Sequence, residues 1–495
     1  MKAIHFALLC LMAILVNPDC HARGSEAELD AVSLKLVAHL FPDATRTLPV
    51  ESPIPHLIVF GGKHILGYSF FTDLIAPIPA YSGYPIRALV SIKPDGTIIE
   101  VRIISHQEPI LVIGVNDETL TNFTSQYEGM SVTSRIRLTG KDRPNSIDGI
   151  SGATITAMVL NGSVIKAAQR VLQAHADSID TPVADIEPLW LTAWQGKKIE
   201  IILLITGLTI LVLMLLFQDW VVVNPSIFSY LHIAFLVYTV VFIGFYCLAQ
   251  LSIINTFTFI SMLAKEFSWD IFLLDPVVFI LWGFVALSIL LWGRGIFCGW
   301  LCPFGAIQEL MNKIAHKLDI KQYEFPLMVH ERLLALKYII LMGLVGLALN
   351  SIPTVATFSE VEPFKTTISL RFQREWYFSA YAIGLILISV FNTKFYCRYI
   401  CPLGALLSFS SLFKIFSWLR RRPECGTSCH TCGNDCSVGA INNKGEIDET
   451  ECHYCLECQT TYWDEHRCPV MVSKRERREK RDKRRTLIPT AEFDD

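Results

Sequence analysis

A dense run of cysteines near the C-terminus constrains this 495-residue sequence most. It holds two groups, each with a tight triplet and a more distant fourth member: Cys425, Cys429, Cys432 and Cys436, then Cys452, Cys455, Cys458 and Cys468. A cubane iron–sulfur cluster needs this pattern, because one short loop supplies three thiolates and a distant cysteine supplies the fourth. We therefore predict two [4Fe–4S] clusters in a ferredoxin-like domain over residues 425–470.

In two-cluster ferredoxins the fourth cysteine of each run ligates the other cluster. This rule assigns one cluster to Cys425, Cys429, Cys432 and Cys468, and the other to Cys436, Cys452, Cys455 and Cys458. The spacing departs from the usual run, since three residues separate Cys425 from Cys429 and Ser437 stands where a proline usually follows. The alternatives are disulfides, which need an oxidising compartment, and zinc sites, which usually show separated pairs of cysteines instead of triplets.

Much of the remaining chain has the composition of a membrane protein. Hydrophobic residues make up 52% and charged residues 18%, far from the average of soluble proteins. Five apolar runs approach the ~20 residues that cross a bilayer: residues 199–217, 226–248, 271–292, 333–350 and 377–393. A shorter run, 251–263, favours an interfacial or re-entrant segment. We predict an α-helical transmembrane core of about five spans within residues 199–418.

Residues 1–22 have the layout of a secretory signal peptide or an N-terminal anchor, with Lys2 before a short apolar core. Either reading exports the residues that follow. Five crossings then end on the cytoplasmic face, and basic residues after the third and fifth spans support this orientation. Lys197 and Lys198 run against the charge bias. We predict a bacterial inner-membrane protein with a periplasmic N-terminal domain and a cytoplasmic cysteine-rich domain.

Two further cysteine pairs form an internal repeat with the pattern Cys-x3-Cys-Pro. The first repeat holds Cys298 and Cys302, and the second holds Cys397 and Cys401. A proline directly after the second cysteine suits the first turn of a new helix. The apolar positions after Cys302 predict a helix that lies on the membrane. The four cysteines either bind one further metal centre together, act as redox thiols, or are buried structural residues.

Residues 27–187 predict an exported α+β domain. Short apolar runs flank Pro94-Asp95-Gly96, which indicates a hairpin turn, and helical spacing predicts a helix over 157–174. Before this helix stands Asp148-Gly-Ile-Ser-Gly-Ala-Thr154. A glycine-bearing loop at a helix N-terminus favours a phosphate group, although the same residues also suit a plain N-cap.

The motif from Asp148 to Thr154 resembles the flavinylation motif of FMN-binding domains in Na⁺-pumping quinone reductases, their Rnf relatives and the NosR/NirI family. The resemblance implies an FMN joined through its phosphate to the hydroxyl of Thr154 by a flavin transferase. It places the other motif residues in the same flavin site: Asp148, Ser151, Gly152 and Ala153. The segment around His106-Gln-Glu-Pro109 is most similar to NosR.

The order of an exported flavin domain, a membrane core with paired Cys-x3-Cys-Pro motifs and a two-cluster ferredoxin resembles the NosR/NirI family over nearly the whole chain. The resemblance implies electron transfer between quinol or cytoplasmic clusters and a periplasmic FMN. It also implies support of a periplasmic nitrous oxide reductase, or of its maturation factors, in denitrification. The alternatives are a redox-sensing regulator of denitrification genes and a component of an ion-coupled electron-transfer complex.

Two features receive ordinary readings. His232 stands alone in the second predicted span, without the second axial ligand that a haem in the bundle would need. We read it first as an ordinary buried residue, with a quinone or proton path as the alternative. The tail, residues 473–495, is basic from Lys474 to Arg485 and then acidic. A solvated, disordered end or a contact with anionic lipid headgroups explains the basic run. We expect no direct binding of nucleic acid, because no reading module accompanies it.

Overall fold

The computed structural model describes most of the chain after residue 36. The described residues are 37–51, 53–78, 80, 84–106, 117–133, 136–138, 146–150, 154–175, 189–263, 269–349, 352–416, 418–419, 422–425, 429–442 and 444–486. The predicted leader, residues 1–22, lies outside them. The chain divides into two compact units, which we call the sheet unit (residues 1–198, 253–276 and 344–360) and the bundle unit (residues 199–252, 277–343 and 361–495).

The sheet unit is built on a five-stranded antiparallel sheet whose strands follow chain order. The strands are β1 (Arg46–Val50), β2 (His56–Gly61), β3 (His64–Phe71), β4 (Arg87–Ile92) and β5 (Ile98–Ser105). The predicted hairpin turn is confirmed between β4 and β5. Gly96 has a φ of +83°, a conformation that glycine adopts without strain, and the Thr97 amide donates to Asp95 Oδ1 at 2.9 Å.

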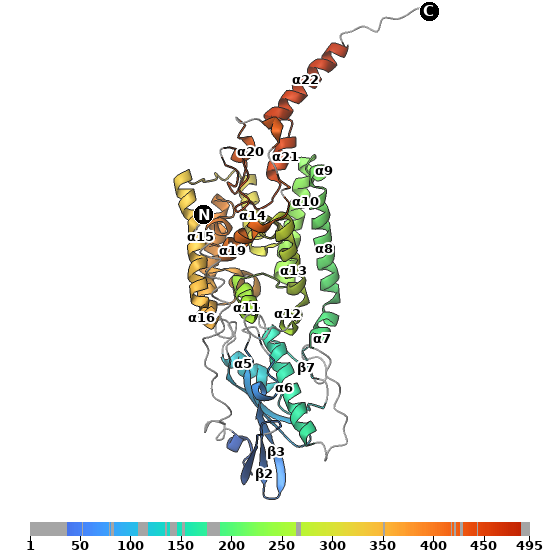
Figure 1. The fold of residues 1–495 in the computed structure, drawn as a ribbon, viewed down its shortest axis with the longest axis vertical. Coiled ribbons are helices and arrows are strands. Elements are labelled where there is room, and N and C mark those ends of the chain that lie inside the picture. The colour runs from blue at the N-terminus through green and yellow to red at the C-terminus, as the bar shows by residue number, and fades with distance from the viewer. Residues whose placement is uncertain are drawn as a thin grey trace, which may run out of the picture. The chain divides into compact units, whose positions relative to one another are not determined.

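Helix α6 (Thr154–Ala174) packs against this sheet and completes its core. Figure 1 shows the helix beside the strands. Val159, Val164 and Val171 are fully buried in one cluster with sheet residues such as Val90. The predicted helix is therefore confirmed, and it begins at Thr154. The shorter elements of this unit are α3 (Thr72–Ile75), α5 (Asp117–Ser125), the parallel pair β6 (Arg137–Leu138) and β7 (Ser146–Ile147), α7 (Leu189–Gly196), α11 (Ile253–Leu263), α12 (Asp270–Leu273) and α16 (Ile352–Phe358).

Long apolar helices dominate the bundle unit and stand upright in Figure 1. They are α8 (Lys198–Leu216), α10 (Pro225–Tyr238) with its π-helical extension η2 (Thr239–Tyr246), α13 (Pro276–Trp292), α15 (Leu327–Ala348) and α17 (Trp376–Phe391). Within the described part of the chain, α8 and the continuous α10–η2 helix are long and apolar enough to cross a membrane, while α13 and α17 are apolar but shorter. The number of five spans stays a prediction.

The third predicted span, residues 271–292, is wrong at its start. A four-residue helix, α12, ends at Leu273, and α13 begins only at Pro276. Proline lacks a backbone N–H and has a fixed φ, so it suits the first turn of a helix and not the interior. The apolar run is therefore interrupted although its composition is continuous.

The two Cys-x3-Cys-Pro repeats fold alike. Cys298 lies in a short helix, η3 (Phe297–Leu301), and Cys397 in α18 (Phe395–Tyr399). The second cysteine of each repeat caps a new helix, α14 (Pro303–Lys317) or α19 (Pro402–Ser410). The Gly305 amide donates to Cys302 Sγ at 3.4 Å, and the Gly404 amide donates to Cys401 Sγ at 3.2 Å. The predicted helix starts are confirmed at both prolines.

The side of α14 that packs into the bundle carries polar residues, and the contact of its apolar positions with the membrane stays a prediction. Ile314 is exposed, whereas the polar residues Gln308, Glu309 and Asn312 are buried. Asn312 Nδ2 donates to the carbonyl of Ser389 on α17. The helix therefore turns polar side chains into the bundle, because partners distant in sequence satisfy them.

The C-terminal part of the bundle unit carries the eight cysteines on short helices and loops. Its helices are η7 (Pro423–Cys425), α20 (Thr431–Asn434), α21 (Glu457–Trp463) and α22 (Pro469–Thr486). The basic run from Lys474 lies within α22, so the reading of these residues as a disordered end is wrong. Arginine, lysine and glutamate favour helix, and the ion pair of Arg475 with Glu479 has the i,i+4 spacing that supports one.

Candidate functional site

The first group of cysteines gathers around Cys432 on α20. Burial, together with the neighbouring thiols of Cys425, Cys468 and Cys429, raises the pKa of Cys432 to about 11. Cys468 itself is buried in a small cluster with Tyr462 and Met471, against which Cys425 packs. The structure thus brings Cys468 to the first triplet, although the two segments are far apart in sequence.

Cys436 lies with the second triplet instead. Burial is the main cause that raises the pKa of the Cys452, Cys455 and Cys458 thiols, and Cys436 contributes to the rise in all three. The loop between these cysteines is tightly turned, since Tyr454 and Leu456 have φ values of +53° and +61°. Such left-handed residues cost free energy and cluster at functional sites.

Backbone and side-chain N–H groups point at these sulfurs. The Tyr454 amide donates to Cys452 Sγ at 3.4 Å, and the Ala440 amide donates to Cys436 Sγ at 3.3 Å. Hydrogen bonds to sulfur help to set the reduction potential of iron–sulfur centres. The donor set, eight thiols with N–H groups aimed at several of them, fits two thiolate-ligated clusters.

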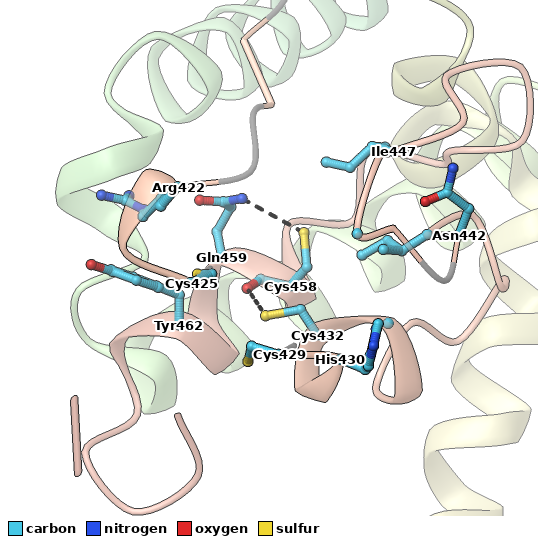
Figure 2. A pocket seen from close by; sticks show the side chains of 13 residues that line it. Arg422, Cys425, Cys429, His430, Cys432, Asn442, Ile447, Cys458, Gln459 and Tyr462 are labelled. Carbon is cyan, nitrogen blue, oxygen red and sulfur yellow. Dashed lines mark hydrogen bonds between the residues drawn. The ribbon is translucent and has the colours of Figure 1, made fainter. Parts of the chain in front are cut away.

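Figure 2 shows a pocket between the two groups, lined by Cys425, Cys429, Cys432 and Cys458. The Cys432 thiol donates to the carbonyl oxygen of Cys458 at 3.4 Å. Among the described residues, no three His, Cys, Asp or Glu side chains converge as they would around a single metal ion. The thiols of each group are therefore spaced more widely than the ligands of one ion.

The four cysteines of the Cys-x3-Cys-Pro repeats also meet, inside the helical bundle. All four are buried. Burial and, to a smaller extent, the thiol of Cys298 raise the pKa of Cys302 to about 11. Burial also raises the pKa of Cys397 and Cys401. Cys302 and Cys298 raise the pKa of Cys397 further, and Cys397 and Cys298 raise that of Cys401. The duplicated motifs therefore supply one buried cluster of thiols.

Cations and amides surround this buried cluster. Arg294, Lys394 and Lys337 lower the pKa of Cys298 against the larger effect of burial, which raises it. Gln308 Nε2 donates to Cys397 Sγ at 3.1 Å. Metal binding requires deprotonated thiols, and these positive charges stabilise thiolates. Burial nevertheless keeps the pKa of all four thiols raised overall. Four buried thiols beside fixed cations are compatible with the ligands of an iron–sulfur centre, and their role stays a prediction.

The second ligand loop, residues 452–458, lies directly on the first Cys-x3-Cys-Pro repeat. Trp300 Nε1 donates to the carbonyl oxygen of Tyr454 at 3.0 Å. A Cβ added to Gly299 would lie 2.0 Å from the carbonyl oxygen of His453, so only glycine permits this approach. The two cysteine clusters are thus joined by backbone contact and one hydrogen bond.

Buried ion pairs fix the same contact. Glu451, next to Cys452, binds Lys337 Nζ at 2.6 Å and Arg294 Nη2 at 3.2 Å. Arg294 Nη1 also donates to the carbonyl oxygen of Gly404 at 2.7 Å. The sequence analysis missed these residues. Their signal was weak, because single charges at the ends of apolar runs are common and their partners lie far along the chain.

The flavin motif is only partly described. The Asp148 amide donates to Gln126 Oε1 at 2.7 Å, and Gln126 Nε2 donates to the Asp148 carbonyl at 3.4 Å. Thr154 is the first residue of α6, whose free N-terminal amides suit a phosphate. Ser151, Gly152 and Ala153 lie outside the described residues, as does the side chain of Thr154.

Three family models match the chain. They are NosR over residues 423–479, a 4Fe-4S binding domain over residues 274–321 and again over 376–424, and an FMN-binding domain over residues 81–169. The two matches to the 4Fe-4S binding domain each contain one Cys-x3-Cys-Pro repeat. The NosR match contains all eight C-terminal cysteines.

Curated relatives agree with these models. The chain is 30% identical to "Regulatory protein NosR" of Pseudomonas aeruginosa over 97% of this chain and 98% of that protein. It is 50% identical to "Regulatory protein NosR" of Stutzerimonas stutzeri, over 61% of this chain and 42% of that protein. It is 42% identical to "Protein NirI" of Paracoccus denitrificans, over 62% of this chain and 44% of that protein. The matched region thus spans less than half of the last two proteins.

Proposed function

The chain belongs to the NosR family of redox proteins with FMN-binding and 4Fe-4S binding domains, and from this premise we propose that it conducts electrons across the bacterial inner membrane. The route joins cytoplasmic iron–sulfur clusters, or membrane quinol, to an FMN on the periplasmic side. Iron–sulfur clusters exchange single electrons, whereas FMN holds one or two. The route ends at a periplasmic nitrous oxide reductase or its maturation factors.

The eight C-terminal cysteines hold two [4Fe–4S] clusters with crossed ligation. Support comes from the mutual influence of the thiols. Cys468 contributes to the raised pKa of Cys432 in the first triplet. Cys436 contributes to the raised pKa of all three cysteines in the second triplet. The resulting ligand sets are Cys425, Cys429, Cys432 and Cys468, and Cys436, Cys452, Cys455 and Cys458.

The four buried cysteines Cys298, Cys302, Cys397 and Cys401 hold a third iron–sulfur centre. Their convergence and the two matches to a 4Fe-4S binding domain support it. A bilayer core of ~30 Å is too thick for one efficient electron-transfer step, so an intermediate centre or a quinone is needed. Both repeats follow predicted spans on the cytoplasmic side, so the third centre occupies that end of the gap.

One observation carries the proposed route, namely the contact of Gly299 and Trp300 with the 452–458 loop. Through this contact, the backbone that carries the second ligand set touches the backbone that carries Cys298 and Cys302. Arg294, Lys337 and Lys394 are fully or almost fully buried. Fixed buried cations stabilise negative charge without reorganisation, so these residues favour the arrival of an electron and exclude water from the contact.

The flavin is attached covalently to Thr154 by a flavin transferase that acts in the periplasm. This attachment and the sidedness rest on the motif and on the FMN-binding domain match. The membrane orientation follows from five spans, of which α8 and α10–η2 have the strongest composition.

Mass spectrometry of the peptide that contains Thr154 tests the proposal. The protein is purified anaerobically from a host that carries the flavin transferase. We expect an FMN phosphoester on Thr154 in the wild type, none in Thr154→Ala, and full occupancy in the control Thr133→Ala, an exposed threonine of the same domain. In cells, Thr154→Ala should abolish nitrous oxide reduction. Full reductase activity without the flavin would refute the route.

A second candidate function is redox-sensing regulation of denitrification genes. The names of two relatives favour it. The basic helix α22 carries no DNA-reading module, so it would act on transcription indirectly, through a partner protein. Truncation after Ser473 separates the candidates: a regulator would lose transcriptional control and keep electron transfer, whereas an electron conduit would keep both.

A further inference from the structure

A large crevice opens in the bundle unit beside α10 and α14. Its volume is about 920 Å³. Its walls come from α10, α14, the segment before α15, the end of α17 and the loops of the cysteine-rich domain. Neither the cysteine clusters nor the flavin motif accounts for this space.

The exposed rim of the crevice, which we call its mouth, carries aromatic residues beside polar ones such as His316 and Glu324. Tyr323 is 64% exposed and Phe391 52% exposed, and both line it. Ile233 and Phe228 of α10 continue the apolar wall. The adjacent outer face of α10 carries Tyr230, which is 77% exposed. Aromatic residues of this kind are enriched where a protein meets the membrane surface, so the mouth suits access from lipid.

The floor of the crevice is polar and deeply buried. His232 is 1% exposed, and among the described residues its Nε2 has no hydrogen-bond partner. It lies 3.5 Å from Glu309 Oε1. Glu309 is in turn paired with Lys394 Nζ at 2.7 Å and Lys313 Nζ at 3.5 Å. A buried imidazole nitrogen without a hydrogen bond is costly, and the ionic contact with Glu309 leaves room for a ligand that supplies one.

The ring of Trp300 packs against His232 from outside the lining of the crevice, with its centroid 4.4 Å from that of His232. Trp300 is the residue that bonds the 452–458 loop. Cys436, which we assign to the second cluster, lines the same crevice. A molecule against His232 would therefore lie beside the electron route.

We propose that this crevice binds the headgroup of a lipid-soluble quinol, with a hydroxyl or carbonyl oxygen of the ring hydrogen-bonded to His232. A quinol has a flat ring with an oxygen on each of two opposite sides, and an apolar tail. The polar floor of the crevice suits the ring oxygens, and the aromatic residues at its mouth suit the tail. The inference rests on the proposed function, because it supplies that route with a membrane donor.

Equilibrium binding of decylubiquinone and of 2-methyl-1,4-naphthoquinone to the full chain in lipid nanodiscs tests the proposal. We expect saturable binding at one site per chain for at least one probe. His232→Leu removes one hydrogen bond and should weaken binding about tenfold. Ile233→Trp narrows the mouth and should abolish binding. Tyr230→Phe, on the outer face of the same helix, is the matched control and should bind like the wild type.

Iron content, flavin content and melting temperature are measured on the same preparations, and His232→Gln serves if the leucine variant does not fold. The site is wrong if the wild type binds neither quinone, or if His232→Leu and His232→Gln both bind normally. If only Ile233→Trp loses binding, the proposal is also overturned. In that case the probe binds by its apolar tail at the mouth, as a phospholipid would, and not through His232. If the wild type carries FMN on Thr154 but binds no quinone, the quinol site is wrong and the proposed electron route still holds, with a cytoplasmic electron donor.

Discussion

Neutralising Glu451 should release the second ligand loop from the helical bundle. The carboxylate lies between Arg294 and Lys337, whose side chains are both fully buried. Glu451→Gln keeps the size of the side chain and removes its charge. Two buried cations then face each other without a counterion, which is the costly way to break a buried ion pair.

The magnitude follows from the contacts. Each charge-assisted hydrogen bond contributes about 1.5–3 kcal/mol, and Glu451 bonds two cations. Breaking such a buried arrangement costs about 3–5 kcal/mol. Since about 1.4 kcal/mol is a factor of ten, the open population of the loop should rise roughly 100- to 3,000-fold.

Hydrogen–deuterium exchange measures this opening directly. The amides of Glu451 and Cys452 donate to the Asp448 carbonyl at 3.1 and 2.9 Å, so their exchange reports whether the loop is closed. We expect exchange in the peptide over 448–456 to accelerate by that factor in Glu451→Gln. Glu446→Gln, an exposed carboxylate of the same segment, should leave the rate unchanged.

A double variant tests whether uncompensated charge is what opens the loop. Lys337→Met added to Glu451→Gln removes one of the two uncompensated cations, so its loop should exchange more slowly than in the single variant. Rates within threefold of wild type in Glu451→Gln, or a double variant that opens more than the single one, would refute the claim that charge compensation holds the loop.

Two further predictions follow from neighbouring contacts. Gly299→Ala should lower the iron content and melting temperature, because its Cβ would strike a backbone oxygen of the ligand loop, whereas Gly283→Ala, with open space around it, should not. Burial alone would raise the pKa of Glu309, but Lys394 and its other charged neighbours lower it to about 2, below its usual 4.5. The ionised Glu309 therefore stabilises the fold above about pH 4.5 and loses this effect as the pH falls towards 2. Glu309→Gln should flatten acid unfolding of the apoprotein over that range, while the exposed control Glu331→Gln should not.

Local patterns predicted the elements near the sites well. The turn at Gly96 and the helix from Thr154 follow from short-range preferences, and the helix starts after Cys302 and Cys401 follow from the prolines behind them. The predicted start of the third span, residue 271, was wrong, because apolar composition alone does not show that the helix is interrupted before Pro276. The polar side chains that α14 buries carried no signal in the sequence, because partners of Gln308 and Asn312 lie on α17.

The sequence alone determined which residues are candidates for the chemistry, since spacing along the chain is what lets cysteines serve one cluster and what marks a repeat or a flavin motif. Only the tertiary structure decided which of these residues meet. It brought the two Cys-x3-Cys-Pro repeats into one buried cluster, set Gly299 against the second ligand loop and enclosed Glu451 between two cations. These contacts join residues 95 or more positions apart, and their energies depend on burial, which spacing does not encode.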